Sequence, residues 1–328
     1  MRFLFLFPFL LLFACTEESR QLPASKGVPS ELLVVLSPDL LETDIPDTLQ
    51  TIVDCDAPGL GTSEPIFRTL TIGSRGYGKM YRQMHSQLRV EIVPGLREPM
   101  LGVARDVTAR PQLLLTVRAA SLGELRTFLS RNRTRIQNLI LDFQLDRRAA
   151  LLKHKHSKKV TDELRRIGYS VFMPVEMQSA KRGQNFLWAS SNSGGDRDVN
   201  FVFYTLPWFG EDIADTDWFV KSRDSVLRAN IPGRLPTQWM QTTRGENGDP
   251  VVWPVLRKLD NTHLMEVRGL WELHGGFMGG PFVAHVRVDT VRRRVVVSEG
   301  FVFSPNTAKR DLLRSVEAGL RTLSKYNQ

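Results

Sequence analysis

The segment HGGFMGGPF at residues 274–282 has the residue types that come closest to a reactive site. In some esterases an HGG sequence presents backbone amides to a developing negative charge, and glycines let a backbone approach a ligand closely. Those enzymes also need a serine within a G-x-S-x-G turn, which this chain lacks. The pattern therefore predicts a loop between strands. A ligand or partner loop stays the alternative, and it would consist of His274, Gly275, Gly276, Met278, Gly279, Gly280, Pro281 and Phe282.

No other pattern indicates a cofactor or a metal. The glycines of GSRGYG at residues 73–78 do not have the spacing of a dinucleotide-binding or phosphate-binding loop. His154 and His156 would point to different faces of a helix, and the lysines around them disfavour a bound cation. We therefore expect no cofactor, no bound metal and no catalytic residue.

Positive charge is concentrated between residues 121 and 167, where twelve Arg or Lys face five Asp or Glu in a chain of net charge +9. Such a face suits anionic lipid or lipopolysaccharide, at about 1 kcal/mol per charge near the surface. The contacts would be Arg131, Arg135, Lys158 and Lys159. A solvated helix face is the simpler alternative. Nucleic acid is disfavoured by the compartment expected below and by the lack of a base-stacking motif.

Two further features allow both a structural and a binding interpretation. Arg223 and Asp224 lie on a helix predicted over residues 217–230, as a buried ion pair or as a polar contact site. All six tryptophans follow residue 187. Aromatic side chains on a sheet face can stack on sugar rings, so a glycan is a candidate ligand, but such side chains more often form core.

The first fifteen residues, MRFLFLFPFLLLFAC, have the pattern of a lipoprotein signal peptide. Arg2 precedes an apolar run over residues 3–13, and a small-residue cleavage site ends at Cys15. Eleven helical residues span about half of a bilayer core, so the run is too short for a transmembrane helix. We expect residues 1–14 to be removed and Cys15 to be lipidated.

Residues 15–30 then form a lipidated cysteine and a flexible tether rich in Ser, Pro and charge. Thr16 is not the aspartate of an inner-membrane retention signal, which favours the periplasmic face of the outer membrane. Glu17 and Glu18 resemble acidic export signals, which leaves surface exposure open. Cys55 has no partner for a disulfide, so core packing alone must hold the fold.

Residues 31–328 are expected to form one globular α+β body with two lobes, at 31–168 and 169–328. If the two lobes arose by an internal duplication, they would have similar folds. Strands grouped with a few long amphipathic helices favour largely antiparallel sheets. Ser121 and Glu124 form a capping box before an apolar stripe that continues to Phe143, which predicts one long helix.

The chain resembles a family of bacterial lipoproteins, mainly of the Bacteroidota type, that are defined by a domain of unknown function. The residues that carry the resemblance are ASKGVPSEL (24–32), EPIF (64–67), RDS (223–225), IPG (231–233), MGGPF (278–282), Pro305 and KR (309–310). The resemblance covers essentially the whole mature chain, as one family unit. It implies an envelope lipoprotein and brings no catalytic residues.

The sequence thus favours a lipid-anchored, non-catalytic envelope protein that binds or organises an envelope protein or glycan. One alternative is a glycan or ester hydrolase without a recognisable motif. The other is a binder of anionic lipid or lipopolysaccharide surfaces through residues 121–167.

Overall fold

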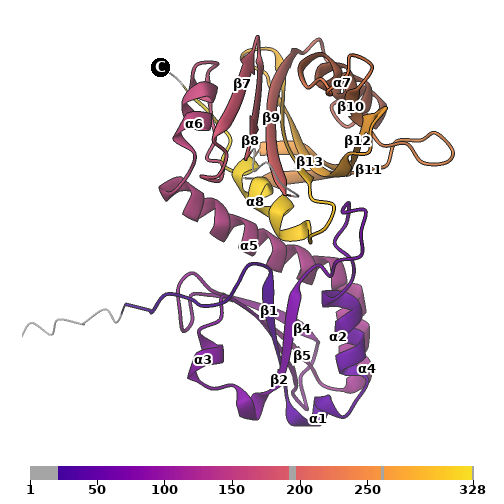
Figure 1. The fold of residues 1–328 in the computed structure, drawn as a ribbon. Coiled ribbons are helices and arrows are strands. Elements are labelled where there is room, and N and C mark those ends of the chain that lie inside the picture. Colours follow the sequence, from indigo (N-terminus) through magenta and orange to yellow (C-terminus); the bar gives the residue numbers. More distant parts are fainter. Residues whose placement is uncertain (1–20, 192–196, 260–261, 327–328) are drawn as a thin grey trace, which may run out of the picture.

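In the computed structural model, which describes residues 21–191, 197–259 and 262–326, the first lobe is built on a five-stranded sheet (Figure 1). The apolar run of β1 alternates, so that Leu32 and Val34 enter the main core while Leu33 and Val35 pack on the opposite face. The strand order is β2-β1-β3-β5-β4, and every pairing except β4 with β5 is parallel. The strands are β1 (Glu31–Leu36), β2 (Arg68–Gly73), β3 (Ser86–Ile92), β4 (Met100–Arg105) and β5 (Leu113–Ala119).

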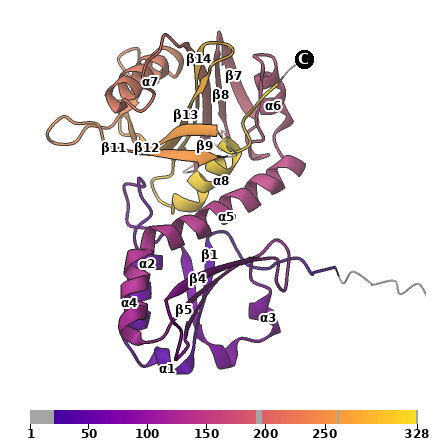
Figure 2. The same cartoon turned by 180° about the vertical axis from the view of Figure 1, so that it is seen from behind.

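Two longer helices, α2 and α4, cover one face of this sheet, and the short α3 lies on the opposite face (Figure 2). The helices of the first lobe are α1 (Pro38–Leu41), α2 (Ile45–Val53), α3 (Lys79–Arg82) and α4 (Leu122–Arg131), with a 3-10 turn, η1 (Ser74–Gly76). The Ser121 hydroxyl accepts the Glu124 amide at 3.4 Å, as the capping box predicts. The expected single helix is nevertheless two, because the Asn132 side chain donates to the Phe128 carbonyl at 2.9 Å and the chain leaves helical geometry there.

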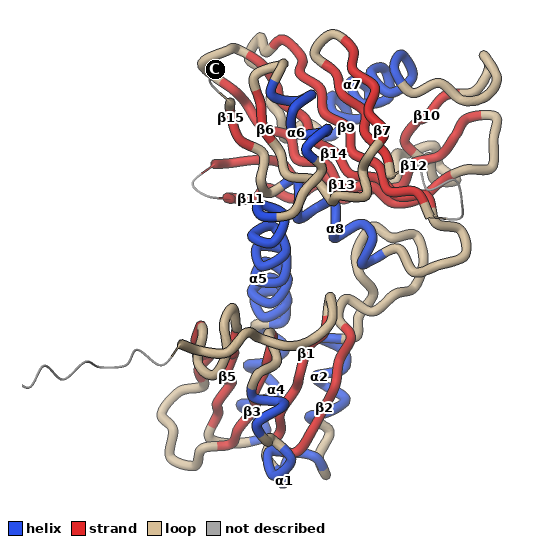
Figure 3. The backbone as a smooth tube through the Cα atoms, turned by 60° about the vertical axis from the view of Figure 1, so that its left-hand side comes forward, coloured by secondary structure: helices blue, strands red, loops and turns tan. Residues whose placement is uncertain are grey.

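The two lobes are joined by α5 (Arg133–His154), which is 22 residues and therefore about 33 Å long (Figure 3). It is followed by α6 (Lys158–Arg165) beside the second lobe. None of the helices in the described part of the chain is long and apolar enough to span a membrane.

The second lobe is an eight-stranded antiparallel sheet in the order β10-β12-β13-β14-β9-β8-β7, with β11 also paired to β12. On β9, Phe201 and Phe203 face the core shared with α5 and α8, while Val202 and Tyr204 face the core under α7. The strands are β7 (Ser179–Gly183), β8 (Phe186–Ser190), β9 (Asp198–Pro207), β10 (Trp239–Thr242), β11 (Val252–Leu259), β12 (Thr262–His274), β13 (Gly279–Asp289) and β14 (Arg294–Phe303). The helices are α7 (Thr216–Asn230) and α8 (Arg310–Leu320), and β6 (Tyr169–Ser170) pairs with β15 (Ser324–Lys325).

The expected α+β class is confirmed. The first sheet, however, is mainly parallel, whereas the second is antiparallel, so the lobes are not copies of one another. Side chains alternate with a period of two in both kinds of sheet, so the apolar pattern alone does not reveal strand direction.

Candidate functional site

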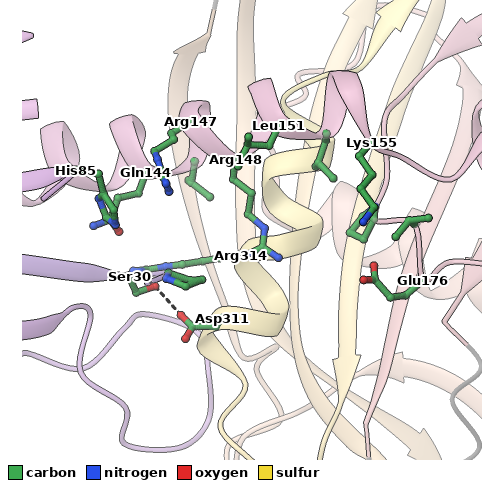
Figure 4. A pocket seen from close by; sticks show the side chains of 15 residues that line it. Ser30, His85, Gln144, Arg147, Arg148, Leu151, Lys155, Glu176, Asp311 and Arg314 are labelled. Carbon is green, nitrogen blue, oxygen red and sulfur yellow. Dashed lines mark hydrogen bonds between the residues drawn. The ribbon is translucent and has the colours of Figure 1, made fainter. Parts of the chain in front are cut away.

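A cavity of about 290 Å³ lies between the two lobes, alongside the C-terminal half of α5 (Figure 4). The first lobe contributes Pro29, Ser30 and His85, and α8 contributes Asp311 and Arg314. The segment after β6 adds Pro174, Val175 and Glu176, and the C-cap of α5 adds Lys155. The cavity is thus built from segments that are distant in sequence.

One face of α5 forms the longest wall. Residues three or four apart lie on the same side of a helix. Gln144 and Leu151 are spaced in this way from both Arg147 and Arg148, and all four side chains line the cavity. The adjacent face is buried in the core through Ile140, Leu141, Leu145, Ala149 and Leu152. The core face therefore fixes the rotation of α5 and holds the two arginines in the wall.

Three guanidinium groups meet at this cavity without an acidic partner. Arg147 and Arg148 extend from α5 into the space beside Ser30 and Arg314 (Figure 4). Within the described ranges, no carboxylate oxygen lies within 4.0 Å of a guanidinium nitrogen of these three arginines. The Nε atom of Arg147 is buried and has no hydrogen-bond partner among the described residues.

Burial is the dominant electrostatic effect on these groups. It lowers the pKa of Arg147 and of Arg148, although the charges of Asp311 and Glu176 partly oppose the effect at Arg148. Burial also lowers the pKa of Arg314 to about 10. All three remain charged at neutral pH, and their charge is desolvated without full compensation.

The carboxylate of Asp311, which also lines the cavity, is already committed to other partners. It accepts hydrogen bonds from Ser30 at 2.6 Å, Arg68 at 2.7 Å and Arg310 at 3.1 Å. Burial raises its pKa, but these hydrogen bonds and the nearby arginine charges hold the pKa below its usual value. The Ser30 hydroxyl also accepts from Arg314 Nη1 at 2.7 Å, so Ser30 links α8 to the first lobe.

A serine and a histidine do contact each other near this wall, but not as a nucleophile and base. His85 Nε2 lies 3.0 Å from the Val28 carbonyl and must donate to it, so Nδ1 accepts from the Ser86 hydroxyl at 2.8 Å. Ser86 is buried, is not part of the cavity lining and also accepts from Gln144. Burial lowers the pKa of His85 and keeps its ring neutral. His85 therefore lines the cavity, but the Ser86 hydroxyl is closed off from it and cannot act there as a nucleophile.

The glycine-containing segment lies elsewhere, at the hairpin between β12 and β13. Phe277 is fully exposed and Met278 is 41% exposed, while Phe282 is completely buried. His274 stacks on Trp239 at 4.0 Å, and Arg228 covers the same indole, so that ring is not free to stack on a sugar. The segment borders a shallow depression of about 380 Å³ that is separate from the cavity between the lobes.

Arg223 belongs to the core of the second lobe, and Asp224 is half-buried beside it. Arg223 is fully buried, donates to Glu299 at 2.7 and 2.9 Å, and lies 3.9 Å from the centre of the Phe282 ring. Asp224 accepts from the backbone amide and the hydroxyl of Thr242. The fully buried ion pair is that of Arg223 with Glu299, whereas the half-buried Asp224 lies 3.3 Å from Arg223 and contacts it from the edge of the core.

The four residues expected on an anionic-surface face are exposed, but they form two separate groups. Arg131 and Arg135 lie where α4 meets α5, whereas Lys158 and Lys159 begin α6. The length of α5 separates them by about 33 Å. The residues that the sequence analysis missed, Arg147 and Arg148, lie between these groups. In the sequence, these residues could have been recognised as two adjacent arginines that follow the apolar stripe within residues 121–167.

Cys15 lies outside the described residues, as does the signal peptide. Among the described residues, His, Cys, Asp and Glu side chains form no group of three that could hold a metal ion. Cys55 is half-buried, and its sulfur accepts a hydrogen bond from the side-chain amide of Gln137 on α5 at 3.1 Å.

Two family models match the chain, both described as a domain of unknown function. DUF4837 matches residues 156–322 and DUF8532 matches residues 25–153. The expected coverage of nearly the whole chain is confirmed, but two models share it instead of one. No curated protein matches the chain.

A crystal structure from Bacteroides thetaiotaomicron is similar at 10% identity, over 49% of this chain and 46% of that chain. The chain therefore spans less than half the length of that protein. Its TM-score of 0.26 is too low to establish a common fold.

Proposed function

The chain belongs to the DUF4837 family, whose function is not known, and we propose that it is a lipid-anchored, non-catalytic binding protein of the bacterial envelope. Its ligand is an anion that occupies the cavity between the lobes. Three arginines without carboxylate partners around that cavity carry the proposal. Removing a charge from water without a counter-charge is costly, so a site that keeps one buried and two half-buried arginines in this state is suited to an anionic ligand.

The binding site is tested by calorimetric titration with inorganic pyrophosphate. We expect Arg147→Gln or Arg148→Gln to weaken binding about 10- to 100-fold, because a hydrogen bond to a charged group contributes about 1.5–3 kcal/mol. Arg135→Gln is the matched control, because it removes an exposed arginine from the same helix. Equal losses in all three variants, or no loss in the cavity variants, would contradict the proposal.

Stability gives a second readout for the same variants. Arg147→Gln removes a partly buried charge that has no partner, so its free energy of unfolding is expected to equal or exceed that of the wild type. A purely structural arginine would show the opposite sign. Urea denaturation without ligand measures the difference.

The anchor is tested separately with Cys15→Ser. We expect the variant to lose palmitate labelling and to move from the membrane fraction to the soluble fraction, because stable anchoring depends on its acyl chains. Lys26→Ser, a change elsewhere in the N-terminal segment, should leave both properties intact. If Cys15→Ser stays membrane-bound, and neither it nor the wild type carries palmitate label, lipid anchoring would be contradicted.

A further inference from the structure

We propose that the ligand of the interlobe cavity is a phosphate monoester on an apolar stem, which rests on the anion-binding function proposed above. The cavity combines arginines from α5 and α8 with apolar side chains, and both properties together lead to this ligand.

The charge of the cavity fits a dianion. Arg147, Arg148 and Arg314 bring three positive charges, and Asp311 is already held by Ser30, Arg68 and Arg310. Lys155 and Glu176 also line the cavity, and their opposite charges balance each other. A monoanionic carboxylate or sulfate ester would leave more of the positive charge uncompensated than a phosphate monoester, which carries about −1.5 to −2 at pH 7.

The geometry also favours phosphate. The guanidinium groups come from two helices, α5 and α8, so they approach an occupant from different directions. Arginine forks match phosphate oxygens and can donate two parallel hydrogen bonds to them. The buried Nε of Arg147, without a partner among the described residues, supplies an additional donor.

The remainder of the wall is apolar. Leu145, Leu151 and Leu152 of α5 face the cavity, together with Pro29, Pro174 and Val175. Leu151 is 58% exposed, which places an apolar side chain where the cavity opens to solvent. Between Gln144 and Lys155 the wall runs for about 16 Å along α5. A small polar anion would fill only part of this length and leave the exposed Leu151 side chain in water.

Calorimetry on the full chain at pH 7.5 tests the ligand class with hexyl phosphate, hexanoate, hexyl sulfate and inorganic phosphate. Hexyl phosphate should bind at least about tenfold more tightly than inorganic phosphate, because burial of two methylenes already accounts for that ratio. It should also bind at least about tenfold more tightly than hexanoate and hexyl sulfate. This preference should decline below about pH 6, where the phosphate takes up a proton and the arginines do not.

Each result bears on a different part of the proposal. Equal binding of hexyl phosphate and inorganic phosphate would overturn the apolar stem and leave the anion site in place. Equal binding of hexanoate would overturn the phosphate monoester. If neither pyrophosphate nor any of these ligands binds, the proposed function itself fails. Arg148→Gln should lose the preference for hexyl phosphate, and Arg135→Gln should keep it.

Vesicles distinguish a lipid source from a soluble one. The full-length Cys15→Ser chain is sedimented with vesicles of phosphatidylcholine that contain either phosphatidic acid, a phosphate monoester, or phosphatidylglycerol, a phosphodiester. Co-sedimentation at least about fivefold greater with phosphatidic acid, and lost in Arg148→Gln, would support a lipid headgroup. Equal co-sedimentation with both lipids, alongside tight binding of hexyl phosphate, would support a soluble phosphate monoester.

Discussion

Replacement of Arg223 by methionine is expected to lower the free energy of unfolding by about 3–5 kcal/mol. Arg223 and Glu299 are both completely inaccessible to solvent, and two hydrogen bonds of 2.7 and 2.9 Å join them. Burial raises the pKa of Glu299, and the Arg223 charge opposes that rise. Without the guanidinium, the carboxylate would be left buried without a counter-charge, and this desolvation is the source of the loss. Urea denaturation measures it.

The double variant Arg223→Met/Glu299→Leu separates the stranded charge from the lost packing. Replacing both ions of a buried pair by apolar side chains is often nearly neutral, so the double variant should recover most of the stability that Arg223→Met loses. If the double variant is as unstable as the single one, the effect comes from packing around Phe282. A loss below about 1 kcal/mol in Arg223→Met would show that solvent reaches Glu299 in the native state.

Gly280→Ala is expected to lower the free energy of unfolding by about 3 kcal/mol, near the upper end for overpacking. A Cβ at this position would lie inside contact distance of the Val302 carbonyl oxygen. Neither backbone can withdraw easily, because β13 is paired with β12 and β14, and β14 is paired with β13 and β9. The clash therefore has to be relieved by displacing a strand at the centre of the sheet.

Gly123→Ala is the matched control, because a Cβ there meets no atom within 4 Å and the residue lies in α4. It should raise stability by up to about 1 kcal/mol, which is the helix propensity difference between glycine and alanine. A Gly280→Ala protein as stable as the wild type would show that the hairpin is looser than the structure indicates. Because Gly280→Ala is expected to disturb the fold, a test of this hairpin as a partner surface is better made at Phe277, whose side chain is fully exposed.

Several elements could be predicted from local sequence because their causes are local. The apolar run at residues 31–36 forms β1, and Ser121 caps α4 through an amide three residues ahead. The helix expected over residues 217–230 is α7 (Thr216–Asn230). In each case the pattern and the interactions it predicts involve neighbouring residues.

Other features depended on contacts that no local pattern records. The break at Asn132 interrupts an apolar stripe that continues through it, and the parallel pairing of the first sheet leaves the same alternation as an antiparallel one. Arg223 became a core residue only because Glu299, on a distant strand, faces it. The basic residues on α4 and α6 were separated by the length of α5.

The sequence by itself determined the α+β class, most of the helices and strands, and the concentration of basic residues in one segment. Only the tertiary structure decided which of those basic residues share a cavity. Arg148 of α5 and Arg314 of α8 meet because both helices pack between the lobes, where long-range burial of apolar side chains places them. Hydrophobic periodicity specifies which face of a helix is buried, but not which distant helix will lie against it.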